Sequence, residues 1–238
     1  MLPTPDPPTF RISSVRRATA STRIVRVDLD GAPFTYVAGQ AAILGLAGHS
    51  GTVPYSIASA PEETAQHGCL EFLIKVEASG RWGHRFDRLA RGMRLTVGGP
   101  LGIFTFPATP PEQRFLFIAG GTGIAPVRAM LAHIELARVP GRCRLLYSAR
   151  TPDDFPYLTE LRRRVTQERL ELTLTATREV GVRWRGERGR IGGNRLAALV
   201  DHPETLCFVC GPAAMMHDVP LMLMGLGIPK LRIYVEEW

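Results

Sequence analysis

The sequence predicts two domains: an antiparallel six-stranded β-domain, barrel or sandwich, followed by an α/β domain built on a parallel five-stranded sheet. Three observations support this fold class. Residues before position 107 form short strand-like runs separated by Gly and Pro turn signals. A proline-rich, polar stretch at 107–113 is typical of a linker. Beyond it, strand-like and helical runs alternate, which indicates a parallel sheet with helices on both faces. The expected boundaries are 1–106, 107–113 and 114–238.

The first domain is expected to contain six strands. Apolar residues alternate with polar ones in these runs, as at Ile24, Val27 and Leu29 among arginines, which is typical of half-buried strands. The runs lie at 10–18, 22–29, 41–46, 55–59, 70–77 and 94–97. One helix is expected at 82–91, with Phe86 and Leu89 facing inward.

The second domain is expected to begin with a strand at 115–119 that breaks into the glycines at 120–123. A helix follows, because Val127, Met130, Leu131 and Ile134 have the spacing of one helix face. It should end near Arg138, and Pro126 suits its first turn, where a missing N–H costs nothing. Strand, glycine turn and helix together can hold an anion at the helix N-terminus, although a tight turn without a ligand has the same pattern.

Further strands are expected at 143–148, 170–177, 206–210 and 231–235, with helices near 156–168, 194–200 and 213–226. Ligands of such sheets bind at the carboxyl ends of the strands. The glycines at 120–123, Arg150, Arg178 and the pair Gly211 and Pro212 all follow strands. We therefore expect them to share one rim of the sheet.

Composition places the chain among ordinary globular proteins, with 45% hydrophobic and 21% charged residues. No apolar run is long enough to span a bilayer, and the proline-rich start does not resemble a signal peptide. The four cysteines are too few and too scattered for a disulfide framework, so a reducing cytoplasm is expected. Cys207 and Cys210 lie three apart in an expected strand and should face opposite ways, so no metal site is expected.

The net charge of +7 is compatible with nucleic acid, an acidic protein partner or a phosphorylated ligand. The arginines are dispersed and no nucleic-acid-binding motif accompanies them. This distribution disfavours nucleic acid and leaves the other two classes open.

Two aromatic positions are candidates for contact with a flat ligand. Alternation in the run at 53–61 puts Tyr55, Ile57 and Ser59 on one face and Ser56 opposite. Tyr55 could stack on a flat ring and Ser56 could donate a hydrogen bond, or the run could be a plain barrel strand. The terminal Trp238 either covers a flat ligand or packs on an apolar surface.

Taken together, these features resemble the ferredoxin–NADP reductase superfamily. The resemblance rests on the two-domain order, Pro-Tyr-Ser-Ile-Ala-Ser at 54–59, Gly-Gly-Thr-Gly-Ile-Ala-Pro at 120–126, Val-Cys-Gly-Pro at 209–212 and the acidic, aromatic end. It covers nearly the whole chain, from Phe10 to Trp238. It implies an FAD-binding antiparallel β-barrel followed by an α/β domain that binds NADP(H) or NAD(H).

The resemblance also implies roles for individual residues. Tyr55 and Trp238 would pack on the flavin, Ser56 would hydrogen-bond near its N5, and Trp238 would move aside for hydride transfer. The implied catalytic residues are Ser56, Cys210, Glu236 and Trp238. The implied flavin-binding residues are Tyr55, Ser56, Ile57, Ser59, Ile74, Lys75, Val76, Gly80, Arg81, Trp82, Gly83, Thr122 and Trp238. The implied nucleotide-binding residues are Gly121, Thr122, Gly123, Pro126, Arg150, Arg178, Arg190, Cys210, Gly211 and Pro212.

Two positions depart from the family pattern. Val53 stands where the family usually has an arginine that pairs with flavin phosphate, and Gly83 stands where it usually has Ser or Thr. Each loss removes a charge-assisted bond of about 1–3 kcal/mol. Arg81, His84 or Arg85 would have to compensate, or the flavin would be loosely held.

The nicotinamide nucleotide is expected to be NADPH rather than NADH. Arg150, Arg178 and Arg190 resemble the arginines with which bacterial reductases bind the 2′-phosphate, and the fork of arginine suits a phosphate. Asp153 and Asp154 lie close enough to a strand end to leave NADH open.

The sequence therefore predicts a flavoprotein that moves electrons from NAD(P)H through FAD to a separate one-electron acceptor. The chain has no cysteine set for an iron–sulfur cluster, and its basic charge suits an acidic ferredoxin or the ferredoxin component of an oxygenase. The alternatives are an NAD(P)H-dependent reductase of free flavin, which the missing arginine suggests, and a non-catalytic electron-delivering or regulatory subunit.

Overall fold

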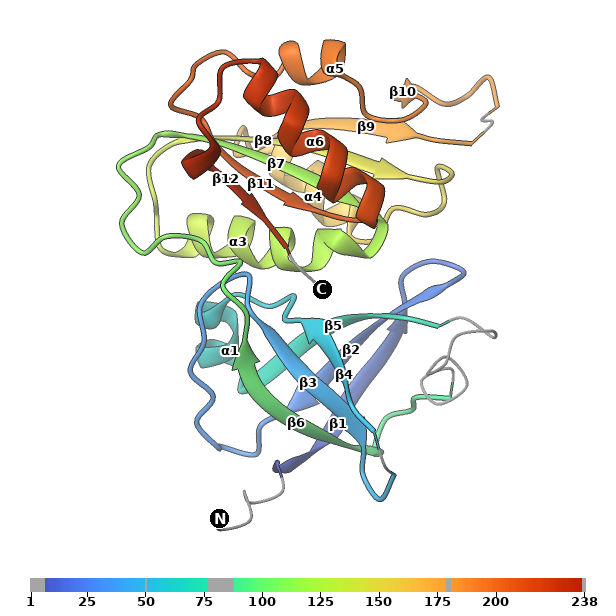
Figure 1. The fold of residues 1–238 in the computed structure, drawn as a ribbon. Helices are drawn as coiled ribbons and strands as arrows, with labels where there is room; N and C mark the ends of the chain where they lie inside the picture. The colour runs from blue at the N-terminus through green and yellow to red at the C-terminus, as the bar shows by residue number, and fades with distance from the viewer. Residues whose placement is uncertain (1–6, 50, 77–87, 179–180, 237–238) are drawn as a thin grey trace.

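The computed structural model describes residues 7–49, 51–76, 88–178 and 181–236, which form two sheet-based domains packed one on the other (Figure 1). The first domain has six strands in the order β4-β3-β6-β1-β2-β5, and all neighbours are antiparallel. The strands are β1 (Thr9–Arg17), β2 (Thr22–Asp28), β3 (Ala41–Leu46), β4 (Val53–Ser56), β5 (Cys69–Lys75) and β6 (Arg94–Leu101). A bridge between Ile57 and Phe72 joins the two ends of the sheet, so it closes into a barrel.

The barrel core follows from the alternation in its strands. Ile12, Val25, Leu44, Phe72 and Leu95 point inward and are fully buried. Burial of this kind stabilises a fold by about 25 cal/mol for each Å² of apolar surface removed from water. The predicted six-stranded antiparallel barrel is confirmed.

The second domain is a parallel sheet with strand order β10-β9-β8-β7-β11-β12. Its strands are β7 (Arg114–Gly120), β8 (Arg142–Ala149), β9 (Glu171–Ala176), β10 (Glu187–Arg188), β11 (Leu206–Cys210) and β12 (Ile233–Val235). Five of these correspond to the five predicted strands. The sixth, β10, has only two residues, too few to leave a pattern in the sequence.

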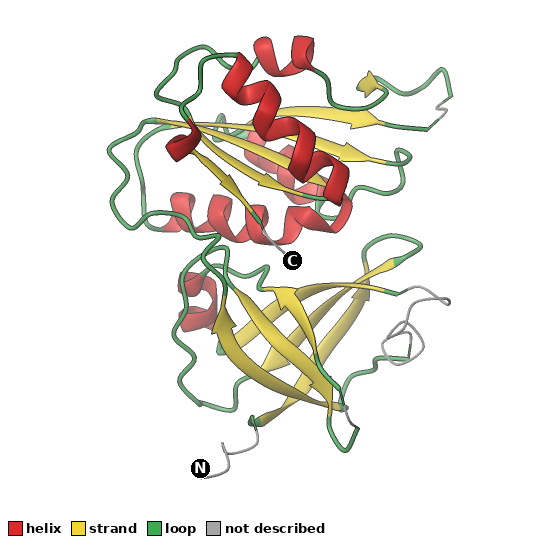
Figure 2. Ribbon diagram, in the orientation of Figure 1, coloured by secondary structure: helices red, strands yellow, loops and turns green. Residues whose placement is uncertain are grey.

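Helices cover both faces of this sheet, as the alternation predicted (Figure 2). They are α3 (Ile124–Leu136), α4 (Leu158–Thr166), α5 (Gly193–Ala197) and α6 (Ala213–Gly225). Helices α3 and α4 share one apolar core with Phe117 and Leu145. Helices α5 and α6 share another with Leu116 and Leu146. Helix α3 lies between the sheet and the barrel (Figure 1).

A short helix that the sequence pattern did not predict, α1 (Pro61–His67), follows β4. Its start is held by the backbone N–H of Ala60, which donates to the Glu63 carboxylate at 2.8 Å. Its end is the left-handed Gly68, with φ of 65°. Most of the helix predicted at 82–91 falls outside the described residues, and residues 88–91 are turn and loop.

The two domains share apolar contacts. Residues 107–113 are loop. Just before them, Phe106 packs its ring 5.1 Å from that of Phe115 and 5.6 Å from that of Phe208. Ile24 and Leu73 of the barrel belong to the same buried cluster. The barrel is therefore joined to the sheet by a continuous core as well as by the chain. No helix of the described residues has the length and apolar character needed to cross a membrane.

Candidate functional site

A cavity of about 780 Å³ lies where the barrel meets the carboxyl ends of the second domain's strands. Tyr55 and Ser56 of β4 line it from the barrel, together with Leu73 and Lys75 of β5. Strand ends line it from the sheet, and α6 closes a third side. The strand ends that the sequence predicted to share one rim are those of β7, β8, β9 and β11, which contribute Gly120, Ser148, Thr177 and Cys210.

The turn between β7 and α3 gives the cavity an open backbone surface. The turn is the 3-10 segment η1 (Gly121–Gly123). Gly121 has φ of +55°, and a Cβ added there would meet nothing within 4 Å. A Cβ on Gly123 would lie 2.3 Å from the carbonyl oxygen of Cys210, so the turn and the end of β11 are in backbone contact. Only glycines allow this close approach and leave the space above free.

Tyr147 supports this turn from beneath. Its side chain is fully buried, and its hydroxyl donates a hydrogen bond of 2.9 Å to the carbonyl oxygen of Gly121. Burial raises the pKa of Tyr147 well above its ordinary value, so the hydroxyl stays a neutral donor. Helix α3 begins directly after the turn, and Ala125 in its first turn lines the cavity. The positive end of the helix dipole therefore faces the site.

The barrel side offers a flat, neutral surface. Burial raises the pKa of Tyr55 to about 12, so its ring carries no charge at neutral pH. The neighbouring Val53 packs against the barrel core and supplies no cation. Lys75, on the adjacent strand, is the cation that lines the cavity from this side in the described barrel.

The end of β11 contributes a thiol. Cys210 is only 6% exposed and lines the cavity with Gly211 and Pro212. Burial, and then the charge of Glu236, raises the pKa of the Cys210 thiol far above its ordinary value. The thiol is therefore protonated at neutral pH and is a small neutral group rather than a nucleophile.

The outer end of the cavity carries mixed charge. Arg150, Arg190, Asp154 and Thr177 line it. Asp154 accepts a hydrogen bond of 2.8 Å from the hydroxyl of Thr151. Arg178 lies next to this end, with its backbone N–H 2.9 Å from the carbonyl oxygen of Arg150, but it does not line the cavity.

Several residues named from the sequence do not line the cavity. Ile57 and Ile74 are fully buried in the barrel core, and Pro126 is buried within α3. Alternation wrongly placed Ser59 beside Tyr55 on a ligand-facing surface, because the run leaves the strand at Ser56. Its hydroxyl is buried and accepts a 3.0 Å hydrogen bond from the backbone N–H of Glu71.

Val76 also lies off the cavity and donates its backbone N–H to the carbonyl oxygen of Ser21 at 2.8 Å. The residues Gly80, Arg81, Trp82, Gly83, His84, Arg85 and Trp238 lie outside the described residues. Glu236 is described and is 2% exposed next to the Cys210 end of β11. The roles that the sequence assigned to all the residues of this paragraph stay predictions.

Sequence reasoning missed two parts of the cavity. One is the tip of the β1–β2 hairpin, from which Thr19, Ser21 and Thr22 line it. The other is the inner face of α6, with Met215 and Met222. Small hydroxyls in a turn and methionines in an apolar helix leave no signal distinct from ordinary structure, so only the packing identifies them.

The described residues fit a flat redox cofactor beside a nucleotide. A neutral tyrosine ring, an open glycine surface at a helix N-terminus and a protonated thiol meet in one cavity. Among the described residues no group of three or more His, Cys, Asp or Glu side chains could hold a metal ion. Cys207 and Cys210 belong to apolar clusters on opposite faces of the sheet, as their spacing predicted.

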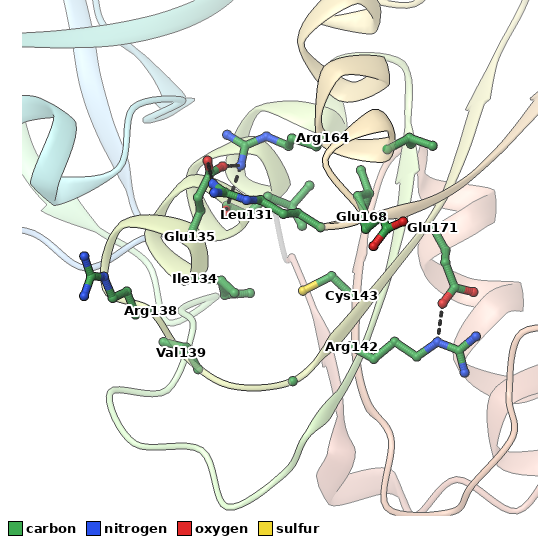
Figure 3. A pocket seen from close by; sticks show the side chains of 14 residues that line it. Leu131, Ile134, Glu135, Arg138, Val139, Arg142, Cys143, Arg164, Glu168 and Glu171 are labelled. Carbon is green, nitrogen blue, oxygen red and sulfur yellow. Dashed lines mark hydrogen bonds and ion pairs between the residues drawn. The ribbon is translucent and has the colours of Figure 1, made fainter.

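A second cavity, of about 620 Å³, lies at the amino-terminal edge of the same sheet (Figure 3). Most of its charged groups are paired, because Arg164 and Arg169 pair with Glu135, and Arg142 pairs with Glu171. Its Cys143 thiol is buried, which raises the pKa to about 12. Since most of its charges are already paired and a parallel sheet binds ligands at the other edge, we place the functional site in the interdomain cavity.

Comparison with known families matches both domains. Residues 9–106 match the model of the oxidoreductase FAD-binding domain. Residues 117–220 match the model of the oxidoreductase NAD-binding domain. The two matches follow the two domains seen in the fold.

Individual relatives agree with these matches. The chain is 31% identical over 220 residues to ferredoxin–NADP reductase B of Sorangium cellulosum, covering 88% of each chain. It is 29% identical over 231 residues to ferredoxin–NAD(P)(+) reductase CarAd of Metapseudomonas resinovorans, covering 95% of this chain and 68% of that one. Its fold matches the crystal structure of a ferredoxin NADP+ reductase from Neisseria gonorrhoeae with bound FAD and NADP. That match has a TM-score of 0.82 at 19% identity and covers 98% of this chain and 99% of the other.

Proposed function

Because this chain belongs to the ferredoxin–NADP reductase superfamily and is an FAD-dependent NAD(P)H oxidoreductase, we propose that it passes electrons to a separate one-electron acceptor. Its cofactors are FAD and NAD(P)H. When bound, FAD supplies the chemistry that links the two-electron donor to a one-electron acceptor. The observation that carries the proposal is the shared cavity, which residues of both domains line.

We assign the barrel side of the cavity to FAD. Tyr55 presents a neutral ring for stacking, and Ser56 presents a hydroxyl that can donate a hydrogen bond. Lys75 supplies positive charge from the next strand. Thr122 faces the same cavity from the sheet side, where it can contact either cofactor.

We assign the sheet side to the nicotinamide nucleotide. The backbone of η1 and the start of α3 offer N–H groups and a positive dipole end to its phosphates. The protonated thiol of Cys210 and the buried Glu236 keep the region beside the reacting rings compact and exclude water. Arg150 and Arg190 at the outer end favour the 2′-phosphate of NADPH, with Asp154 as the competing feature that would favour NADH.

The test of this function is the absorption spectrum of the purified protein, followed by anaerobic titration with NADPH and with NADH. The expected result is a yellow protein whose visible absorbance is bleached by NADPH at lower concentration than by NADH. A bound flavin that neither nucleotide bleaches would refute the proposal.

One observation favours a second candidate function, the reduction of free flavin. Val53 packs against the barrel core and offers no guanidinium to a flavin phosphate. If the flavin is a substrate, the protein will purify colourless and will oxidise NAD(P)H with saturable dependence on added flavin. A colourless protein that neither binds nor reduces flavin would instead favour a non-catalytic subunit.

We propose an acidic ferredoxin, or the ferredoxin component of an oxygenase, as the electron acceptor. The β1–β2 hairpin reaches the cavity with Thr19, Ser21 and Thr22, and its flanks carry the exposed residues Arg16 and Arg17. Positive charge beside the site would steer an acidic partner toward it. The free thiols of the four cysteines fit a reducing cytoplasm.

The docking hypothesis predicts a salt-dependent effect of these arginines. Replacing Arg16→Glu and Arg17→Glu together should raise the KM for an acidic ferredoxin about tenfold at low salt, because the steering charge is reversed. Reduction of ferricyanide, which needs no docking surface, should be unchanged. The control is Arg11→Glu, an exposed arginine at the other end of β1. An equal effect of Arg11→Glu would place the docking surface elsewhere.

A further inference from the structure

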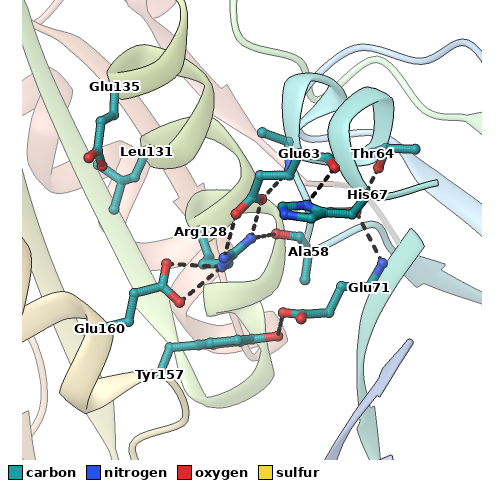
Figure 4. A network of polar contacts seen from close by, with 12 residues as sticks. Ala58, Glu63, Thr64, His67, Glu71, Arg128, Leu131, Glu135, Tyr157 and Glu160 are labelled. Atoms are coloured by element: carbon teal, nitrogen blue, oxygen red, sulfur yellow. Dashed lines mark hydrogen bonds and ion pairs between the residues drawn. The ribbon is translucent and has the colours of Figure 1, made fainter. Parts of the chain in front are cut away.

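One buried guanidinium joins the two domains beside the site (Figure 4). Arg128, on α3 of the second domain, has a side chain only 8% exposed. Its two terminal nitrogens donate to the two carboxylate oxygens of Glu63 on α1 of the barrel, at 2.5 and 2.8 Å. It also donates to the carbonyl oxygen of Ala58 at 2.9 Å. Its Nε lies 3.1 Å from the Glu160 carboxylate on α4.

The two charges of this pair stabilise each other. Burial opposes the charged form of Arg128, but its hydrogen bonds and the charges of Glu63 and Glu160 outweigh burial and raise its pKa. Burial likewise opposes ionisation of Glu63, yet the bonds and charge of Arg128 lower its pKa. Both groups are therefore ionised, and the contact is a bidentate fork with a fixed geometry.

A second polar bridge lies next to the first. The hydroxyl of Tyr157, which precedes α4, donates to the Glu71 carboxylate of the barrel at 3.0 Å. Glu71 in turn accepts from Arg26 at 2.8 Å. The guanidinium of Arg128 lies 5.5 Å from the centre of the Tyr157 ring. A second directional contact therefore joins the two domains beside Arg128.

The partners of Arg128 lie close in the chain to the residues that line the functional cavity. Ala58 follows Tyr55 and Ser56 after only a short stretch, and Ala60 and Glu63 cap the helix that comes next. On the other side, Arg128 lies in α3, which begins directly after the glycine turn η1. One side chain therefore connects the barrel segment assigned to flavin with the helix that starts at the nucleotide-binding turn.

We propose that Arg128 is a positioning residue that fixes the flavin-binding and nicotinamide-binding segments at the separation and angle that electron transfer between their rings requires. The proposal rests on the function proposed above. Arg128 does not line the cavity and acts through Ala58, Glu63 and α3.

The pair of Arg128 and Glu63 adds a fixed orientation of the two domains relative to each other. A buried ion pair is weak support for stability, because desolvation of the two charges offsets much of their attraction. The apolar contacts of Phe106 with Phe115 and Phe208 already hold the domains together. They are not directional in the way a bidentate fork is, and a shift of about 1 Å between reacting groups can slow a reaction a hundredfold.

The chain contains a matched control for Arg128. Arg164 on α4 has a side chain 6% exposed, and it pairs with Glu135 and Glu160. All three residues belong to the second domain. Replacing Arg164 removes a buried ion pair within the second domain and leaves the bonds from Arg128 to Glu63 and Ala58 in place, although Glu160 loses one of its two arginine partners.

The experiment compares Arg128→Met and Arg164→Met by anaerobic stopped-flow reduction of the bound flavin over a range of NADPH concentrations. For Arg128→Met we expect the limiting rate to fall at least about tenfold, with the half-saturating NADPH concentration within about twofold of wild type. Arg128→Lys keeps the charge but loses the fork, so its limiting rate should lie between those of wild type and Arg128→Met. Arg164→Met should keep the wild-type limiting rate even if its melting temperature drops.

A wild-type limiting rate in Arg128→Met, or an equal loss in Arg164→Met, would overturn the proposal. Glu63→Gln is the second variant if Arg128→Met does not fold, because glutamine can still accept the bond from the Ala60 N–H. For this variant too, a wild-type limiting rate, or an equal loss in Arg164→Met, would overturn the proposal.

Crystal structures of the flavin-free variants give a readout independent of activity. Wild type and Arg164→Met should show the same angle between the barrel and the sheet, and Arg128→Met should show a changed angle. The same angle in all three would count against orientation by Arg128. If NADPH and NADH both fail to reduce wild-type flavin, the proposed function falls, while the comparison of the domain angle still decides whether Arg128 orients the domains.

Discussion

Tyr147 shows how a single buried hydroxyl supports a cavity surface that it does not itself form. The residue lies in the middle of the sheet domain, on β8, and its hydroxyl reaches the Gly121 carbonyl at 2.9 Å. This bond holds η1 in a conformation with positive φ at Gly121. The ring of Phe155 packs edge-on against Tyr147, with centroids 5.0 Å apart, and fixes its orientation.

We predict that Tyr147→Phe weakens nucleotide binding without affecting flavin binding. The Gly121 carbonyl loses one hydrogen bond, which is worth about 0.5–1.5 kcal/mol, so the Kd for NADP+ should rise about two- to tenfold. Isothermal titration calorimetry with NADP+ measures the change.

The control for this prediction is Tyr36→Phe. Tyr36 is a similarly buried tyrosine whose hydroxyl bonds the Ser59 carbonyl oxygen and the Thr64 hydroxyl inside the barrel, away from η1. Its loss should lower stability and leave the NADP+ affinity unchanged. A Tyr147→Phe protein with wild-type affinity would mean that the glycine turn keeps its shape without this support.

At the scale of elements, the junction of β7, η1 and α3 is the part of the fold that couples backbone geometry to the site. Its two outer glycines have different constraints. Gly121 needs a positive φ and faces open space, whereas Gly123 has an ordinary φ of −61°, and a Cβ added to it would lie 2.3 Å from the carbonyl oxygen of Cys210. The first is a conformational requirement and the second a packing requirement.

This difference predicts different effects of alanine at the two positions. Gly121→Ala should destabilise the protein by about 1 kcal/mol, the cost of a left-handed non-glycine residue. Gly123→Ala should cost about 3 kcal/mol, because the added Cβ forces β11 away from the turn. Urea denaturation followed by circular dichroism measures both. Equal costs, or a larger cost at Gly121, would contradict the packing argument.

Helix α1 is the second element with a role larger than its size. Its seven residues carry two of the contacts with the second domain, because Glu63 pairs with Arg128 and Glu62 lies 2.8 Å from Nδ1 of His133. It also begins directly after the segment that carries Tyr55 and Ser56. The helix therefore links the position of α3 to the strand that we assign to flavin.

At the scale of the whole molecule, the domain interface combines an apolar core with charges that depend on pH. The folded-state pKa of Glu63 is lowered, so the contact with Arg128 contributes its full stability above the ordinary carboxyl pKa of 4.5. That contribution is lost as the pH falls through the lowered value. Acid should therefore loosen the interface before it affects the barrel core.

We predict that the stability difference between wild type and Glu63→Gln depends on pH. It should be largest at pH 6–7 and should shrink as the pH falls below the ordinary carboxyl value of 4.5, because protonated Glu63 then resembles glutamine. Thermal unfolding at a series of pH values measures it. The comparison variant is Glu171→Gln, whose carboxylate pairs with Arg142 and Arg144 far from the interface. A difference that stays constant with pH would show that the charge of Glu63 does not stabilise the fold.

The sequence by itself determined the two-domain order, the six antiparallel strands, the parallel sheet and the rim on which Gly121, Thr122, Arg150 and Cys210 meet. These features follow from local periodicity and from the rule that parallel strands end on one edge, so they need no knowledge of distant contacts. Alternation failed at Ser59, and at α1 the run was too short to show a helical period.

Only the tertiary structure decided which side chains face the cavity and what joins the domains. Arg128 and Glu63 are separated by 65 positions in the chain, and Tyr157 and Glu71 by 86. Nothing in the neighbourhood of either residue in the sequence marks its partner, because such pairs depend on how the barrel and the sheet pack. In the sequence, Arg128 on α3 looks like any charged helix residue. Its burial becomes favourable only because the barrel supplies the Glu63 carboxylate.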